Sequence, residues 1–555
     1  MPSQRPLASS FVVIMWCLGP GPGAESQRRQ PAPEIVAAGA EGVLREASAL
    51  ASKQDARQRL WTDCVLLRIG AAQIRAHDFD GALLSLKSTD YTDGRNGGLI
   101  DLAEAIASAG DRDRAFAVLR QLREHGWRQD YIEDRVQLRW VDHLVAINNL
   151  ARASQAVDQL NSPRYRADGL RRLAVAHANA GDSQRAAEFF KRALTAAMAA
   201  ADDSDRFRAV SEVANAQLAS GMPAAALITA RRLAESSDGE APWGKICALR
   251  DAAVIAAKAK DNATARELFR RAAAAASTVD GLNTRNAIGL IATGRAAAGY
   301  IDEALSAAST IPDDFARADA LGEIVVAQLR ANDVQGAART VVSDKYPAPY
   351  RDNARARIVD FQITKRDLKA ALAAAEELDN QSRKAAAKLR IATAYARSGD
   401  RTAANEIAGR IELVFRDLLI FRDEPKRRFE FLEPRTWGEL YNMGMGSSMR
   451  AHHVATERAT EVAATAMTLA LAMGHKHAKS YAVLFDGITA EEVIQALARA
   501  HAAHGDPGEA LVWARQIGSD QRADLNDDKA VRAVERRIHA LLGVGEGILD
   551  RAKRP

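Results

Sequence analysis

Residues 170–193 read LRRLAVAHANAGDSQRAAEFFKRA, and this stretch contains the pattern on which the fold depends. Apolar and small residues up to Ala174 recur at the spacing of one helix face, which predicts a first helix. Gly181 can end that helix in a left-handed conformation, and Asp182 can cap the next one. Ala186 is five residues beyond the turn, where its small side chain lets the second helix approach the first. The stretch predicts a helical hairpin.

The same order of turn and alanine recurs along the chain, with 30 to 41 residues between successive turns from His77 to Gly399. The predicted turn residues are His77, Gly110, Ala151, Gly181, Gly221, Lys260, Gly299, Asn332, Arg366, Gly399 and Gly505. The alanines five residues later are Ala82, Ala115, Ala156, Ala186, Ala226, Ala265, Ala304, Ala337, Ala371, Ala404 and Ala510. A degenerate unit turns at Gly474. The sequence therefore predicts an all-α, superhelical solenoid of about twelve antiparallel helical hairpins.

These units resemble tetratricopeptide repeats. That family carries a large residue, Leu, a small residue and Tyr on its first helix, then Ala, an aromatic residue and Ala on its second. The resemblance covers roughly residues 60–415 and 455–520, although unit length varies and the family's closing proline is missing. It implies a right-handed superhelix whose concave groove binds peptides or partner proteins.

Five polar residues are candidates for partner binding in such a groove, the alternative being solvated positions on helix surfaces. They are Glu104, Asn148, Arg171, Asn215 and Arg499. The family's known clamp for a terminal carboxylate uses Lys and Asn on first helices. Here Ser211 stands where that Lys is expected beside Asn215, so an acidic peptide tail is not the expected ligand.

Residues 416–450 interrupt the repeat and are rich in aromatic side chains. One interpretation is a long connection that packs on the solenoid through its own side chains. The other is a recognition patch for protein or polysaccharide, because aromatic and Arg side chains dominate interface hot spots. Its candidate binding residues are Arg427, Phe429, Phe431, Trp437 and Tyr441.

The first 24 residues have the features of a secretory signal peptide: Arg5, an apolar run over 7–18, and small residues before a cleavage point. A flexible linker is expected over 25–45, the solenoid over 46–415, and C-terminal repeats over 451–555 that end in a capping helix around 530–552. The predicted location is extracytoplasmic, either periplasmic or secreted. The alternative is a cytoplasmic regulatory adaptor with a disordered N-terminus.

Repeats of this kind are binding scaffolds more often than catalysts, so the sequence favours a scaffold over an enzyme. The 555 residues carry a net charge of only +5 and no long Lys/Arg run, so nucleic acid is not an expected partner. The sequence contains no recognisable catalytic or metal-binding motif, so no cofactor is expected. Nor does any segment reach membrane-spanning length without charges.

The prediction is a non-catalytic scaffold that binds a protein or peptide, with a role in assembling complexes at the cell envelope. The alternative is a protein that binds or acts on polysaccharide through the 416–450 insertion. The sequence leaves the oligomeric state open.

Overall fold

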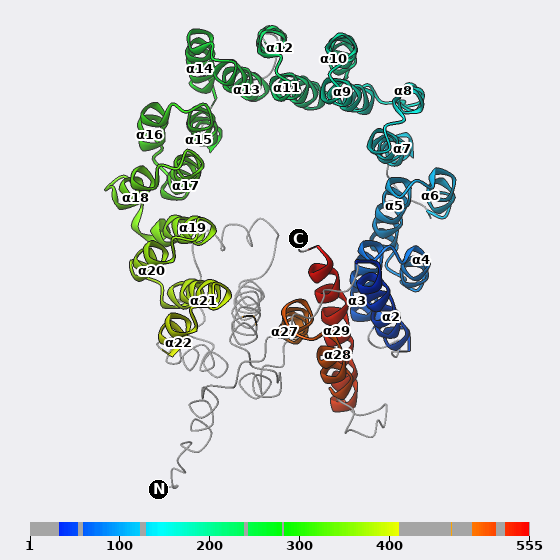
Figure 1. The fold of residues 1–555 in the computed structure, drawn as a ribbon. Helices are drawn as coiled ribbons and strands as arrows, with labels where there is room; N and C mark the ends of the chain where they lie inside the picture. Colours follow the sequence, from blue (N-terminus) through cyan, green and yellow to red (C-terminus); the bar gives the residue numbers. More distant parts are fainter. Residues whose placement is uncertain are drawn as a thin grey trace.

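The computed structural model describes residues 33–53, 59–122, 129–237, 242–279, 282–409, 468, 491–517 and 528–553. Throughout these ranges the regular elements are helices, and no strand occurs among them (Figure 1). Antiparallel pairs follow one another along the chain, as the repeat pattern predicts.

Eleven hairpins are described, each made of a first and a second helix. The first helices are α3 (Arg59–Arg75), α5 (Thr92–Ser108), α7 (Gln129–Ala146), α9 (Pro163–Asn179), α11 (Asp203–Ala219), α13 (Pro242–Lys258), α15 (Leu282–Ala297), α17 (Asp314–Arg330), α19 (Arg351–Thr364), α21 (Gln381–Arg397) and α27 (Glu491–His504). The second helices are α4 (Phe79–Lys87), α6 (Arg112–Leu119), α8 (Leu150–Asp158), α10 (Ser183–Met198), α12 (Pro223–Ser236), α14 (Asn262–Ala276), α16 (Ile301–Ser309), α18 (Val334–Val342), α20 (Leu368–Glu376), α22 (Arg401–Gly409) and α28 (Pro507–Gln516). A 3-10 turn, η2 (Ala348–Tyr350), precedes α19.

The structure confirms ten of the eleven predicted turn residues and corrects one. Nine of them have positive φ, from His77 to Gly399. The tenth described residue with positive φ is Asn148 (φ 57°), whereas the predicted Ala151 lies inside α8. Asparagine tolerates the left-handed region better than alanine does, so the turn forms earlier than predicted. Gly505 does not adopt positive φ, although a bend still separates α27 from α28.

The alanine five residues after each turn marks the contact between the two helices. Because the third turn lies at Asn148, the alanine five residues after it is Ala153 and not the predicted Ala156. Counted this way, the alanine is completely buried in all eleven described hairpins. The next residue after the turn often caps the second helix. Asp182, for example, accepts a hydrogen bond from the Arg185 N–H at 3.1 Å.

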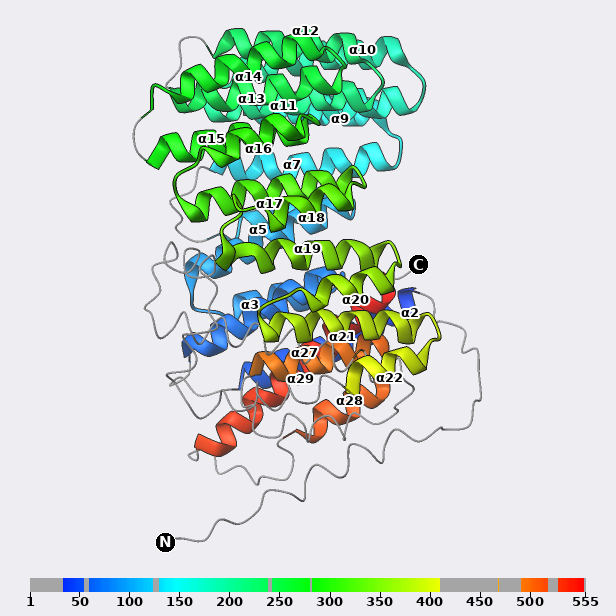
Figure 2. The ribbon, with the colours of Figure 1, turned by 90° about the vertical axis from the view of Figure 1, so that its left-hand side faces the viewer.

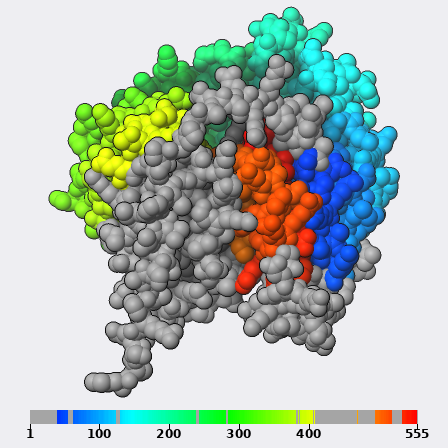
Figure 3. Space-filling view, turned by 60° about the horizontal axis from the view of Figure 1, so that its bottom comes forward, coloured from blue at the N-terminus to red at the C-terminus, as the bar shows by residue number. Residues whose placement is uncertain are grey.

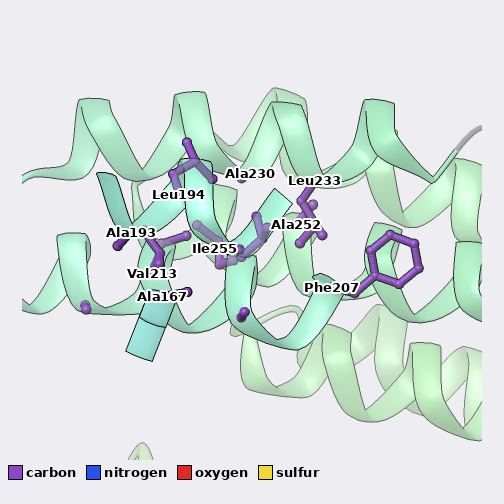
Figure 4. Close-up of a cluster of buried hydrophobic side chains, with 14 of the residues drawn as sticks. Ala167, Ala193, Leu194, Phe207, Val213, Ala230, Leu233, Ala252 and Ile255 are labelled. Carbon is purple, nitrogen blue, oxygen red and sulfur yellow. The ribbon is translucent and has the colours of Figure 1, made fainter. Parts of the chain in front are cut away.

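Stacking of the hairpins places the first helices on the inner face of a curved array and the second helices on its outer face (Figures 1 and 2). The apolar core consists of clusters strung along the array rather than one centre. Figure 4 shows the central cluster, in which Val213 of α11 lies near Ala193 and Ile255, while Phe207 of the same helix stands to one side. Small side chains such as Ala193 and Ala252 allow this close packing.

A separate core joins the two ends of the chain. Helix α2 (Pro33–Ala51) occupies residues that were expected to be a flexible linker, so that expectation is wrong from residue 33 onward. The expected C-terminal helix is α29 (Asp528–Ala552), and it packs against both α27 and α2. Leu44 of α2 and Leu541 of α29 are fully buried in this cluster. In Figure 3 the C-terminal residues (orange and red) lie directly against the N-terminal ones (blue).

Polar contacts reinforce this junction. Arg515 of α28 pairs with Glu46 of α2 at 2.6 Å, and Arg75 of α3 pairs with Glu546 of α29 at 2.6 Å. On the opposite side of α27, Arg397 of α21 donates to His504 Nδ1 at 3.0 Å. The curved array together with α27–α29 is called the ring below: α29 packs against α2 and α3 at one end of the array, and a hydrogen bond from Arg397 of α21 reaches α27 from the other. Among the described helices, none combines the length and the apolar character needed to cross a membrane.

Candidate binding surface

A ladder of charged side chains runs along the inner face of the ring. Glu104 of α5 accepts a hydrogen bond at Oε2 from Arg139 Nε of α7, at 2.9 Å, and its Oε1 forms an ion pair with Arg135 of the same helix. Asp142, one turn beyond Arg139, pairs with Arg172 of α9. Each pair joins neighbouring first helices, so the predicted residue Glu104 stands in a bonded network that crosses from hairpin to hairpin.

The ladder continues through α9 toward α11. Asp168 bonds to both Arg171 and Arg172, and Arg171 lies 3.9 Å from Glu212 of α11. Burial, reinforced by the nearby Arg139, lowers the pKa of Arg172 to about 10. Burial and the charge of Asp168 raise the pKa of Glu212. Both shifts have burial as their main cause, because removal from water disfavours the charged form of either group.

The inner face is hollowed where α11, α13, α15 and α17 meet, forming a cavity of about 970 Å³. Glycines on α15 help to create it. At Gly289 an added Cβ would meet nothing nearer than 3.9 Å, and at Gly294 it would stand 2.6 Å from Arg250 Cγ. Because glycine has no side chain, Gly289 leaves open space in the cavity and Gly294 leaves room for the side chain of Arg250. Val254 and Leu290 supply apolar lining.

Polar groups line this cavity from α11 and α13. Asn215, a predicted binding residue, donates from Nδ2 to the Ser211 carbonyl oxygen at 2.9 Å, and its exposed side chain borders the hollow. Ser211 Oγ donates to Asp251 Oδ2 at 3.2 Å. Burial raises the pKa of Asp251, although the neighbouring Arg250 and the Ser211 hydrogen bond oppose that rise.

Two aromatic side chains stand at the N-terminal ends of their helices beside the cavity. Trp243 of α13 is 42% exposed and Phe315 of α17 is 38% exposed. Between them Arg285 of α15 pairs with Asp313 at 3.1 Å. Large aromatic side chains that remain exposed beside a concave surface are typical of protein-recognition sites.

A second cavity, of about 1110 Å³, lies where α19–α21 face α27 and α29. Arg499, another predicted residue, lines it and donates from Nε to Asp550 Oδ2 at 2.6 Å. Arg397 and His504, the pair that closes the ring, also border it.

The predicted binding residues thus fall into three groups. Glu104, Arg171, Asn215 and Arg499 lie on the inner surface of the ring, but no single cavity brings all four together. Asn148 does not belong there, because it is the left-handed turn residue before α8. The five candidates of the 416–450 insertion, Arg427, Phe429, Phe431, Trp437 and Tyr441, lie outside the described residues.

Buried polar pairs that the sequence analysis missed tie the helices of a hairpin together. Thr229 Oγ1 donates to Gln217 Oε1 at 2.8 Å, and Thr340 Oγ1 donates to Gln328 Oε1 at 3.0 Å. Ser85 makes the same bond with Gln73 at 2.7 Å. In each case the two residues are 12 positions apart, a regular spacing that could have revealed them.

Another missed signal joins successive hairpins. In seven hairpins an Arg or Lys precedes the turn residue by 15 positions: Arg95, Arg166, Arg206, Lys245, Arg317, Arg351 and Lys384. All five arginines of this set donate to a backbone carbonyl at the end of the preceding hairpin, as Arg166 does to Leu160 O at 2.7 Å. The bonds satisfy backbone carbonyl groups in the connections that follow the second helices.

The array of hairpins, with its completely buried alanines and its left-handed turn residues, defines the architecture. The described helices form a tetratricopeptide-like solenoid. Neither a family model nor a curated protein matches the sequence. In the part of the chain that the structure describes, no group of three or more His, Cys, Asp or Glu side chains has an arrangement that could hold a metal ion.

Several solved structures of other proteins resemble this one at low identity. Ton1535 from Thermococcus onnurineus NA1 is 15% identical, with 57% of this chain and 99% of that chain covered and a TM-score of 0.24. The Cut9–Hcn1 hetero-tetramer of APC/C is 13% identical over 84% of this chain and 95% of its own, with a TM-score of 0.26. A circular tandem repeat protein is 12% identical over 94% and 99%, with a TM-score of 0.14. With TM-scores this low, no functional conclusion follows from them.

Proposed function

We propose that this protein is a scaffold that binds polypeptide on the inner face of its ring, chiefly in the cavity between α11 and α17. The observation that supports the proposal is the composition of this cavity: an apolar lining, exposed amide groups and two partly exposed aromatic side chains. The tetratricopeptide-like fold supports it as well, since concave surfaces of such repeats are suited to extended ligands.

An extended polypeptide fits these groups for a chemical reason. Its backbone N–H and C=O groups need partners when they leave water, and an amide side chain can both donate and accept hydrogen bonds. Asn215 of α11 and Asn286 of α15 present such amides in the lining of the hollow. Trp243 and Phe315 are suited to apolar side chains of the ligand.

Site-specific crosslinking tests this proposal. A photoreactive phenylalanine derivative replaces Trp243 on the inner face or, as a control, Ile228, which is exposed on the outer helix α12. We expect polypeptide adducts at Trp243 and few at Ile228, with the inner adducts reduced by the second substitution Asn215→Ala. Equal labelling at the two positions, or glycan in place of polypeptide at Trp243, would contradict the proposal.

Export and action at the envelope are a finer proposal, supported by the apolar run over 7–18 and the small residues that follow. N-terminal sequencing of the protein from its native cells tests it. A mature chain that begins near Glu25 is the expected result. An intact Met1 in cytoplasmic protein that binds polypeptide would favour the cytoplasmic adaptor.

A further inference from the structure

Asp251 lies in the wall of the cavity between α11 and α17, where its surroundings leave its charge incompletely compensated. Its side chain is 29% exposed. Ser211 Oγ donates to Oδ2 at 3.2 Å, which is a long hydrogen bond between oxygen atoms. One carboxylate oxygen therefore has a weak donor from the protein.

The other oxygen faces Arg250 without receiving a hydrogen bond from Nε. Arg250 Nε lies 2.8 Å from Asp251 Oδ1, yet this buried nitrogen makes no hydrogen bond, so its N–H does not point at the oxygen. The aliphatic part of Arg250 lies across Gly294 of α15, where a Cβ would stand 2.6 Å from Cγ. Arg250 thus attracts the carboxylate by proximity but leaves Oδ1 able to accept from another donor.

Burial raises the pKa of Asp251 despite this neighbouring guanidinium, because removal of water disfavours the charged form more than Arg250 and Ser211 favour it. A cation brought in by a ligand would relieve that imbalance. Asp319 and Glu323 of α17 also line the cavity, where Glu323 pairs with Arg357 at 3.1 Å. Among the cationic lining residues, Arg285 pairs with Asp313 at 3.1 Å, and the charge of Lys258 lowers the pKa of Asp251, although by less than burial raises it.

From this complementarity we propose that the cavity recognises a polypeptide through a lysine or arginine side chain that pairs with Asp251. The proposal rests on polypeptide binding at the inner face and adds the charge of the ligand. The incoming ammonium or guanidinium donates to Oδ1 of Asp251, while Asn215 and Asn286 hold the backbone on either side. Charge-assisted hydrogen bonds of this kind are stronger than neutral ones, particularly away from bulk water.

Peptide pools of defined composition test the charge requirement. The probes are four fluorescent pools of random dodecapeptides that differ at one fixed central position: Lys, Arg, norleucine or Glu. Their binding to the full chain is measured by fluorescence anisotropy. We expect the Lys and Arg pools to bind about tenfold more tightly than the norleucine pool, corresponding to about 1.4 kcal/mol, and the Glu pool to bind most weakly.

Variants assign the preference to one residue. D251N removes the charge while keeping the shape, and we expect the Lys and Arg pools to lose their tenfold advantage. D302N makes the same charge change at an exposed position of the outer helix α16, and it should keep the wild-type preference. D251E keeps the charge but moves the carboxylate, so an intermediate preference is expected.

Three results would overturn the inference, and they differ in what else they contradict. Equal binding of all four pools to the wild-type protein, or full preference in folded D251N, excludes recognition by Asp251 but leaves polypeptide binding intact. Absence of binding by every pool contradicts the proposed function as well. Circular dichroism of each variant establishes that the comparison is made between folded proteins.

Discussion

Gly545 of α29 lies directly against Leu44 of α2, so that a Cβ on the glycine would stand 2.6 Å from Leu44 Cδ2. This contact joins the two ends of the chain. Gly543 and Gly547 of α29 face α27. A Cβ on Gly543 would stand 2.2 Å from Gln495 O, and one on Gly547 would stand 2.3 Å from Arg499 O. Three glycines within one helix weaken it intrinsically, so their presence in α29 is explained by close approach to α27 and α2.

The first prediction concerns this junction. Gly547→Ala should lower the free energy of unfolding by about 1–3 kcal/mol, because its Cβ meets backbone atoms of α27 that cannot move aside easily. Gly97→Ala is the control, since Gly97 lies inside α5 with nothing within 4 Å of an added Cβ. There we expect a gain of about 0.5–1 kcal/mol. Urea denaturation measures both, and a neutral Gly547→Ala would contradict the close packing of α29.

The second prediction concerns the alanine that marks each hairpin. Ala186→Leu should cost about 1–3 kcal/mol, because the site is fully buried between α9 and α10 and has no room for a larger side chain. Ala187→Leu places the same side chain on the exposed face of α10 and should change stability by less than about 0.5 kcal/mol. Similar melting temperatures for the two variants would show that the assigned helix contact is wrong.

The third prediction concerns the buried bond between Thr229 and Gln217. Thr229→Val keeps the shape but removes the hydroxyl that donates at 2.8 Å, leaving the Gln217 oxygen buried without that donor. The expected cost is about 1–3 kcal/mol. Thr195→Val on the exposed face of α10 is the matched control, with an expected change within about 0.5 kcal/mol. Thermal unfolding of both variants decides whether the Gln–Thr pair stabilises the hairpin.

The fourth prediction is a pH dependence at Asp251. Its pKa is raised in the folded protein, so the native state holds this proton more tightly than the unfolded chain does. The resulting stabilisation is present below the ordinary Asp pKa of about 4 and is lost as pH rises through the native value. At neutral pH the ionised carboxylate therefore destabilises the fold, and Asp251→Asn should raise the melting temperature.

This gain should shrink as pH falls toward the ordinary pKa of aspartate, because the wild-type carboxyl group becomes protonated there. Melting curves of wild type and variant across that range provide the measurement. A variant that is less stable than wild type at neutral pH would show that Arg250 and Ser211 compensate the charge fully.

Local sequence determined the hairpins because their signals act over short distances. A glycine or asparagine permits the left-handed turn, the following Asp caps the next helix, and an alanine five residues on permits close contact. The turn at Asn148 was misplaced because Ala151 also fitted the alanine spacing. Sequence likewise suggested Glu104, Arg171, Asn215 and Arg499 as inner-face residues, since helical period fixes which face a side chain occupies.

Tertiary structure alone decided how those faces come together. Closure of the ring depends on α2 and α29, whose contact joins opposite ends of the chain and leaves no local pattern except the glycines of α29. The cavity at Asp251 depends on the curvature of four hairpins and on the glycines of the neighbouring α15. Local sequence determines the conformation of each helix pair, whereas dehydration and charge balance at a site are set by all the helices packed around it.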